Sequence, residues 1–117
     1  MEAYVRKLSK EIEGDLKENT IELFYKVKNA IRLYGHSLEH VKEKYAAASG
    51  LDKSTYTLIE DDAVKGTFKT KISPIKNNQK LRVKISFKGT SSRGKQLVDI
   101  ICAELVRNRT DNLKNED

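Results

Sequence analysis

The segment from Gln79 to Lys88, QKLRVKISFK, decides the fold class of this 117-residue chain. Its polar and apolar residues alternate with a period of two, which places them on opposite faces of an extended chain. One face carries Leu81, Val83, Ile85 and Phe87, and the other carries Lys80, Arg82, Lys84, Ser86 and Lys88. This pattern predicts a strand with one face in a core and the other in solvent.

Two further segments before this strand share its period of two. Residues 66–73 place Phe68, Thr70 and Ile72 on one side, and residues 55–60 form a shorter strand of the same kind. The connections, 61–62 and 74–78, are short enough for antiparallel neighbours. We therefore expect a three-stranded antiparallel meander.

Helical periods flank the meander on both sides. Residues 92–108 predict a last helix, which Ser91 or Ser92 can cap, with its apolar stripe facing inward. Before the meander, residues 3–13, 19–35 and 37–50 each show a helical period. These could be three helices or one long bent helix, because an internal glycine costs only about 1 kcal/mol.

The expected architecture is an α+β domain of two layers, in which helices cover one sheet face and the other stays in contact with water. We divide the chain into an N-terminal helical segment 1–35, an α-β-β-β-α domain 36–108 and a polar tail 109–117. The N-terminal helices could also join two copies of the chain through a shared apolar stripe. The stripe contains Ile21, Phe24, Val27, Ile31 and Tyr34.

Composition favours a soluble protein of the cytoplasm. The lone Cys102 cannot form an internal disulfide, the start of the chain has no signal-peptide pattern, and no apolar run reaches the length of a membrane span. The formal net charge is +6. Such a balance points to an anionic partner.

The positive charge is concentrated in one block, residues 63–98, which contains no acidic residue. Surfaces built only for solubility mix the two signs, so a block of one sign favours an anion-binding role. Its basic residues are Lys65, Lys69, Lys71, Lys76, Lys80, Arg82, Lys84, Lys88, Arg93 and Lys95.

We predict phosphate contacts in two parts of this block. The first is the start of the last helix, where Arg93 and Lys95 adjoin free backbone N–H groups, with Lys88 nearby. The second is the wet sheet face, an accessory surface with no aromatic residue on which bases could stack. Its predicted ligands are Lys69, Lys71, Lys80, Arg82 and Lys84.

Three motifs resemble enzyme or metal signatures without their context. Residues 89–95 fit G-x-x-x-x-G-K, but Gln96 stands where magnesium needs a hydroxyl, and the preceding strand is not apolar on both faces. His36 and His40 fit H-x-x-E-H, but no motif supplies a third ligand. Cys102 lies on an inward stripe without a partner cysteine. We therefore expect no enzyme activity, metal site or cofactor.

From Ser37 to Val106, the predicted order helix, strand, strand, strand, helix resembles the double-stranded RNA-binding domain. Ser37–Tyr45 would stand for its first helix, and Ser92-Arg93-Gly94-Lys95 falls where the family has the lysine-rich start of its last helix. The resemblance implies that these helix-start cations contact major-groove phosphates of duplex RNA.

Two classes of function remain open from the sequence. The first is a small non-enzymatic nucleic-acid-binding protein that contacts the phosphate backbone of duplex RNA or DNA. The alternative is a protein-interaction module, an inhibitor or adaptor, that docks its basic face on an acidic protein. The sequence does not distinguish RNA, DNA and acidic protein as partners.

Overall fold

The computed structural model describes residues 2–10, 16–75 and 80–107 of the chain. In chain order the elements are β1 (Glu2–Lys10), α1 (Leu16–Tyr34), β2 (Leu38–Ala46), a 3-10 turn η1 (Ala47–Ser49), β3 (Leu51–Glu60), β4 (Ala63–Ile75), β5 (Lys80–Gly89) and α2 (Ser92–Arg107). All strands join one antiparallel sheet in the order β1-β5-β4-β3-β2.

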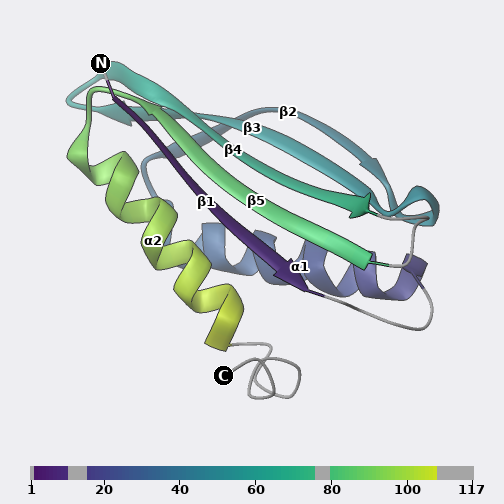
Figure 1. Ribbon diagram of the computed structural model, residues 1–117. Coiled ribbons are helices and arrows are strands. Elements are labelled where there is room, and N and C mark those ends of the chain that lie inside the picture. The colour runs from purple at the N-terminus through teal and green to yellow at the C-terminus, as the bar shows by residue number, and fades with distance from the viewer. Residues whose placement is uncertain (1, 11–15, 76–79, 108–117) are drawn as a thin grey trace.

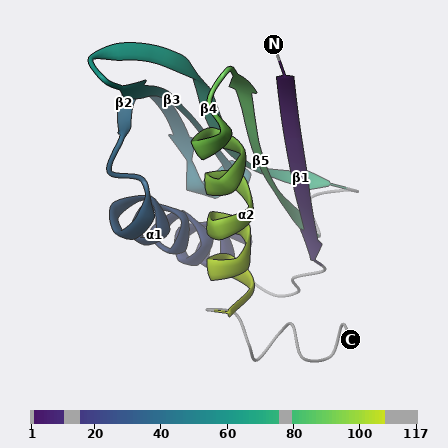
Figure 2. The same ribbon diagram turned by 90° about the vertical axis from the view of Figure 1, so that its left-hand side faces the viewer.

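Both helices lie on the same side of this sheet, as Figures 1 and 2 show, and no described helix or strand covers its other side. The predicted α+β class with two layers is therefore confirmed. The sheet is larger than the predicted meander, because it has five strands instead of three. We call the side that carries the helices the inner face and the uncovered side the outer face.

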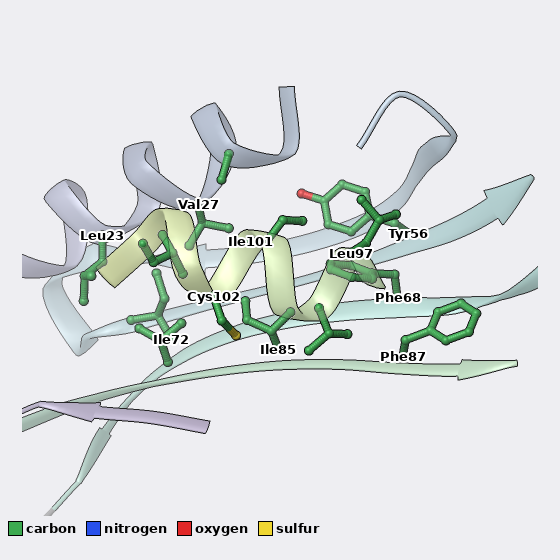
Figure 3. Close-up of a cluster of buried hydrophobic side chains, with 14 of the residues drawn as sticks. Leu23, Val27, Tyr56, Phe68, Ile72, Ile85, Phe87, Leu97, Ile101 and Cys102 are labelled. Carbon is green, nitrogen blue, oxygen red and sulfur yellow. The ribbon is translucent and has the colours of Figure 1, made fainter. Parts of the chain in front are cut away.

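The core fills the space between the inner face and the two helices. Figure 3 shows side chains of α1, α2 and the sheet gathered in one cluster. Apolar residues one turn apart on α1 and the alternate residues of β3, β4 and β5 reach it, as the periods of 3.6 and 2 require. Its members include Leu23, Val27, Tyr56, Phe68, Ile72, Ile85, Phe87, Leu97, Ile101 and Cys102.

The elements after residue 50 are close to their predicted positions. The three expected strands are β3, β4 and β5, and the expected last helix is α2. The backbone N–H of Arg93 donates to Ser91 Oγ at 3.0 Å, so Ser91 is the residue that caps α2. Asp61 and Asp62 form the two-residue turn between β3 and β4, both with positive φ.

The predicted helix 3–13 is wrong for its described part, because residues 2–10 form β1. Apolar residues such as Tyr4 and Leu8 are four positions apart in the sequence, and this spacing fits one side of a strand as well as one side of a helix. The register decides between the two: β1 pairs with β5 from Glu2 opposite Gly89 to Lys10 opposite Leu81. Residues 11–13 lie outside the described residues.

The predicted helix 37–50 is also wrong, because Leu38–Ala46 forms the edge strand β2. Leu38 and Tyr45 are seven residues apart, which fits two helical turns but would place them on opposite faces of a regular strand. The register shifts between His40 and Lys42, so Val41 is an extra residue in the strand. This bulge brings Leu38 and Tyr45 to the same face, which explains the helix-like spacing.

The middle helix of the prediction is α1, although it starts earlier than expected. It begins at Leu16, before the predicted start at residue 19. Its end agrees with the prediction, since the helix stops at Tyr34. The backbone N–H of Gly35 donates to the Ile31 carbonyl at 2.7 Å, and the chain then turns into β2.

Residues 1–35 do not form a separate segment in the described part of the chain. β1 pairs with β5, and Leu23, Val27 and Ala30 of α1 are buried in the core. The apolar stripe of α1, which could have joined two copies, packs mainly within its own chain, because Val27 is in the core and Phe24, Ile31 and Tyr34 pack against it. The predicted tail 109–117 lies outside the described residues.

Candidate functional site

The outer face collects most of the predicted site residues. Lys69 and Lys71 on β4 alternate with buried Phe68, Thr70 and Ile72, so they lie on the uncovered side of the sheet. On β5 the same alternation places four predicted cations there, namely Lys80, Arg82, Lys84 and Lys88. The predicted lysine-bearing face therefore exists as one surface.

Register aligns lysines of different strands into a single row across the outer face. Lys44 of β2 lies opposite Lys53 of β3, Lys53 opposite Lys71 of β4, and Lys71 opposite Lys84 of β5. The next register position, on β1, is Lys7. We call Lys44, Lys53, Lys71 and Lys84 the lysine row. Like charges directly opposite each other in a sheet are destabilising, so the row lowers the stability of the unliganded sheet.

No described carboxylate forms an ion pair with any member of the lysine row. The outward positions of the described strands β2 to β5 carry one acidic residue, Glu39. It lies opposite Thr57, whereas the row crosses β3 at Lys53, farther along the strand. The row is therefore an uncompensated line of positive charge, which an external anion would neutralise.

Two shallow hollows lie over the outer face. One, of about 490 Å³, spans β2, β3 and β4, and its cationic lining is Lys42, Lys44, Lys53, Lys69 and Lys71. The other, of about 610 Å³, lies at the start of β4 and the end of β5, with Lys65, Lys69 and Lys88 beside the hydroxyls of Thr67, Ser86 and Thr90. Lys69 lines both hollows, which makes them neighbours along one cationic track.

Sequence reasoning missed the β2 and β3 part of this track. Lys42 and Lys44 belong to the segment interpreted as a helix, and Lys53 precedes the predicted start of its strand at residue 55. The only local signal for a strand was the spacing of two between Lys42 and Lys44, and it was weak because Glu43 between them is charged as well.

The second predicted cluster, at the start of α2, has a different environment. The guanidinium of Arg93 is directed to the end of α1, where Nη2 donates to the carbonyl of Tyr34 at 3.4 Å. Lys95 is half-buried on the same helix, whereas Lys88 is exposed on the outer face. Arg93 therefore contacts the helical layer and is not combined with Lys88 in one described site.

Gly94 explains the glycine of the G-x-x-x-x-G-K pattern by packing. A Cβ atom added to Gly94 would collide with the ring of Phe87, and the ring also lies close to Gly66 and Gly89. The glycines let α2 approach the end of the sheet around this ring. The pattern therefore has a structural cause that needs no nucleotide.

The histidine and cysteine motifs do not gather around a common point. His36 Nε2 lies 3.1 Å from the Leu33 carbonyl, and His40 packs on the Tyr56 ring with Nε2 3.5 Å from Glu43 Oε1. Cys102 is buried in the core. In the described residues, no cluster of three or more His, Cys, Asp or Glu side chains could hold a metal ion.

A polar cluster connects α1 to the inner face near β2. Lys28 Nζ donates to Glu43 Oε1 at 3.0 Å, Ser54 Oγ at 3.1 Å and Tyr56 OH at 3.2 Å. Burial alone would lower the pKa of Lys28, but the hydrogen bonds to Glu43 and Tyr56 outweigh burial and raise it. Lys28 therefore stays charged and ties the helix to the sheet.

Asp52 is the unusual member of this region. Its side chain is completely buried, and neither carboxylate oxygen has a hydrogen-bond partner in the described part of the structure. Burial raises its pKa to about 6, although the charge of Lys28 acts in the opposite direction. The group is therefore costly to ionise.

No described helix has both the length and the apolar character that crossing a bilayer requires.

Comparison with known proteins gives no family for this chain. No family model matches it, and no curated protein matches its sequence. Solved structures that align with it include a protein of Nitrosospira multiformis, at 10% identity over 92% of each chain and a TM-score of 0.46. A protein of Thermus thermophilus aligns at 8% identity over 91% of this chain and 95% of that one, with a TM-score of 0.43. Ara h 8.0201 aligns at 11% identity over 92% and 99%, with a TM-score of 0.39.

The resemblance to the double-stranded RNA-binding domain rested on an element order that the structure does not have. Ser37–Tyr45, which stood for the first helix, lies almost entirely in strand β2.

Proposed function

We propose that this chain is a small non-enzymatic nucleic-acid-binding protein that contacts the phosphate backbone through the outer face of its sheet. The observation that carries the proposal is the lysine row, in which Lys44, Lys53, Lys71 and Lys84 are register neighbours on four strands. In a folded chain that holds like charges this close, binding of a polyanion relieves their repulsion and lowers the free energy.

The chemistry of the surface favours backbone contact over base reading. Nearly all of its cations are lysines, which are compact point charges suited to phosphate oxygens, whereas base edges are read mainly by forked side chains such as Arg. The outward positions of β2 to β5 carry no aromatic ring. We therefore infer sequence-independent binding, with duplex RNA or DNA as the first ligands to test.

The test compares two double variants with equal changes of net charge. Lys71→Glu/Lys84→Glu removes two cations of the lysine row, and Arg93→Glu/Lys95→Glu removes the two at the start of α2. Because each substitution replaces +1 by −1, both variants fall from +6 to +2. Circular dichroism and thermal unfolding verify that each variant is folded.

Electrophoretic shifts with duplex RNA, duplex DNA and single strands are measured across a salt series. For B-DNA we expect Lys71→Glu/Lys84→Glu to flatten the slope of log K against log salt by about 2, since each lost phosphate contact contributes about 0.9. The Arg93→Glu/Lys95→Glu variant should keep most of the wild-type slope. If the wild type binds no nucleic acid at low salt, as the alternative of an acidic protein partner predicts, the proposal is overturned.

A further inference from the structure

Three aromatic side chains, one partly buried and two exposed, form a cluster at the β2 edge of the sheet. Phe24 and Tyr25 come from α1, and Tyr45 comes from the edge strand β2. The centroid of the Phe24 ring lies 4.2 Å from that of the Tyr45 ring, at an interplanar angle of 30°. It lies 5.4 Å from the centroid of the Tyr25 ring, at an angle of 74°. Tyr25 is 60% exposed and Tyr45 is 41% exposed. We call these three residues the aromatic edge.

Contacts with the core and with Lys28 hold the aromatic edge in place. Phe24 packs against the core, and Lys28 Nζ lies 5.1 Å from the centre of its ring. The same ammonium group is anchored by Glu43, Ser54 and Tyr56. Two carboxylates lie near Tyr45: Glu43 is engaged by Lys28, and Asp52, the register partner of Tyr45, is completely buried beneath the sheet surface.

The strand order brings the aromatic edge close to the end of the lysine row at Lys44. β2 is the last strand of the sheet, so one of its sides has no strand neighbour. Lys44 faces the outer side and Tyr45, the next residue, faces the α1 side, where it meets Phe24. A ligand strand whose backbone follows the lysine row to Lys44 reaches the rings by turning around this open edge.

We propose that the aromatic edge stacks an unpaired base of a nucleic acid whose backbone lies on the lysine row. This inference rests on the proposed function and narrows its ligand to single strands, or to duplexes that end in an unpaired overhang. Tyrosine rings are suited to this role because every base presents a π-face, and one stacked base strengthens binding about tenfold. The preference should not depend on base sequence.

The test compares ligands of equal charge with and without bases. Oligothymidylate and an abasic oligonucleotide of the same length carry the same phosphates, and only the first can stack. The chain has no Trp and five Tyr, so quenching of tyrosine fluorescence reports stacking directly. For the wild type we expect about tenfold tighter binding of oligothymidylate, with quenching that the abasic ligand does not produce.

Matched variants separate the ring from the bulk of the side chain. Tyr25→Leu/Tyr45→Leu should lose the preference for oligothymidylate and keep the abasic affinity. Tyr25→Phe/Tyr45→Phe keeps the rings and should keep the preference. For this variant the preference is measured as the ratio of its affinities for oligothymidylate and the abasic ligand. Leu33→Ser removes an exposed apolar side chain elsewhere on α1 and should leave the preference unchanged.

The outcomes distinguish this inference from the proposed function. Equal binding of both ligands by the wild type overturns the aromatic edge as a base site and leaves backbone binding intact. Binding of neither ligand overturns backbone binding itself. If the Leu variant changes the sedimentation of the free protein without changing the ligand preference, the rings join two copies of the chain, and the inference is wrong.

Discussion

Asp52 is the residue whose chemistry departs furthest from its ordinary behaviour. Buried carboxylates in proteins are usually paired or hydrogen-bonded, and neither holds for Asp52 among the described residues. Thr70 Oγ1 is also buried without a hydrogen-bond partner there. Because a proton removes the charge, the folded state binds it more tightly than the unfolded chain does.

We predict that stability depends on pH through this group. The pKa of Asp52 rises from an ordinary 3.8 to about 6 on folding. Below pH 3.8 both states are protonated and the ionisation costs nothing. As the pH rises from about 4 to about 6, the unfolded chain loses its proton first and the folded state is destabilised, by up to about 3 kcal/mol.

The measurement is urea unfolding of the wild type and Asp52→Asn between about pH 3.5 and 8. The free energy of unfolding of Asp52→Asn minus that of the wild type should increase between about pH 4 and 6 and then stay constant. Asp61→Asn, which removes an exposed carboxyl group on the turn, is the control for the loss of one charge. A difference that does not vary with pH would contradict the prediction.

At the scale of the element, the strands differ in how much of them a local pattern can predict. β3, β4, β5 and α2 follow their own period, and sequence alone placed them within a few residues. The sequence did not predict β2 as a strand, because the bulge at Val41 changes the side of every later residue. Nor did it predict β1, because its partner β5 lies more than 70 residues away in the chain and no local pattern reports the pairing.

The same reasoning applies to the candidate site. The alternation of β4 and β5 predicted that lysines would share a face. The alignment of Lys44, Lys53, Lys71 and Lys84 depends on register between strands, which a single sequence does not contain. The aromatic edge depends on a contact between α1 and β2, and both the strand and its bulge had to be known to find it.

We predict that the lysine row weakens the free protein at low salt. In Lys53→Gln/Lys71→Gln, two neighbouring charges of the row are neutralised, so the variant should be more stable than the wild type by roughly 0.5–1 kcal/mol in dilute buffer. The gain should disappear near 1 M salt, where the Debye length is about 3 Å. Urea unfolding at both salt concentrations measures it.

A single substitution outside the row provides the control. Lys88 lies opposite Thr67 rather than another lysine. Lys88→Gln should therefore change stability much less than either substitution in the row. A row variant that is less stable than the wild type at low salt would show that the lysines are not in mutual repulsion.

At the scale of the whole molecule, the two sides of the sheet differ both in what covers them and in their charge. The helices lie on the inner side of the sheet (Figure 2), where the core is, and the lysine row lies on the outer side. On α1 the charges are mixed, with Glu22 beside Lys26 and Lys28 paired with Glu43. The molecule therefore presents one strongly positive face, which can orient an approaching polyanion before contact.

The described elements also pack as one unit, although the sequence suggested a boundary at residue 35. A chain of residues 36–117 would keep β2 to β5 and α2 and lose β1 and α1. Without β1 the edge of β5 has no partner from Gly89 to Leu81, and without α1 the core lacks Leu23, Val27 and Ala30 (Figure 1). Both losses expose groups that the complete chain buries or pairs.

We predict that the 36–117 chain has no cooperative unfolding transition. Folded domains keep only about 5–15 kcal/mol of net stability, and the burial of each large apolar side chain contributes about 1.5–3 kcal/mol, so the removal of a core helix and an edge strand exceeds that margin. Urea unfolding followed by far-UV circular dichroism measures the transition.

Adding a peptide of residues 1–35 in excess should restore the cooperative transition, since the peptide supplies β1 and α1. A cooperative transition of 36–117 alone, with a spectrum like that of the complete chain minus one helix, would show that the core closes without α1 and that the boundary at residue 35 is real.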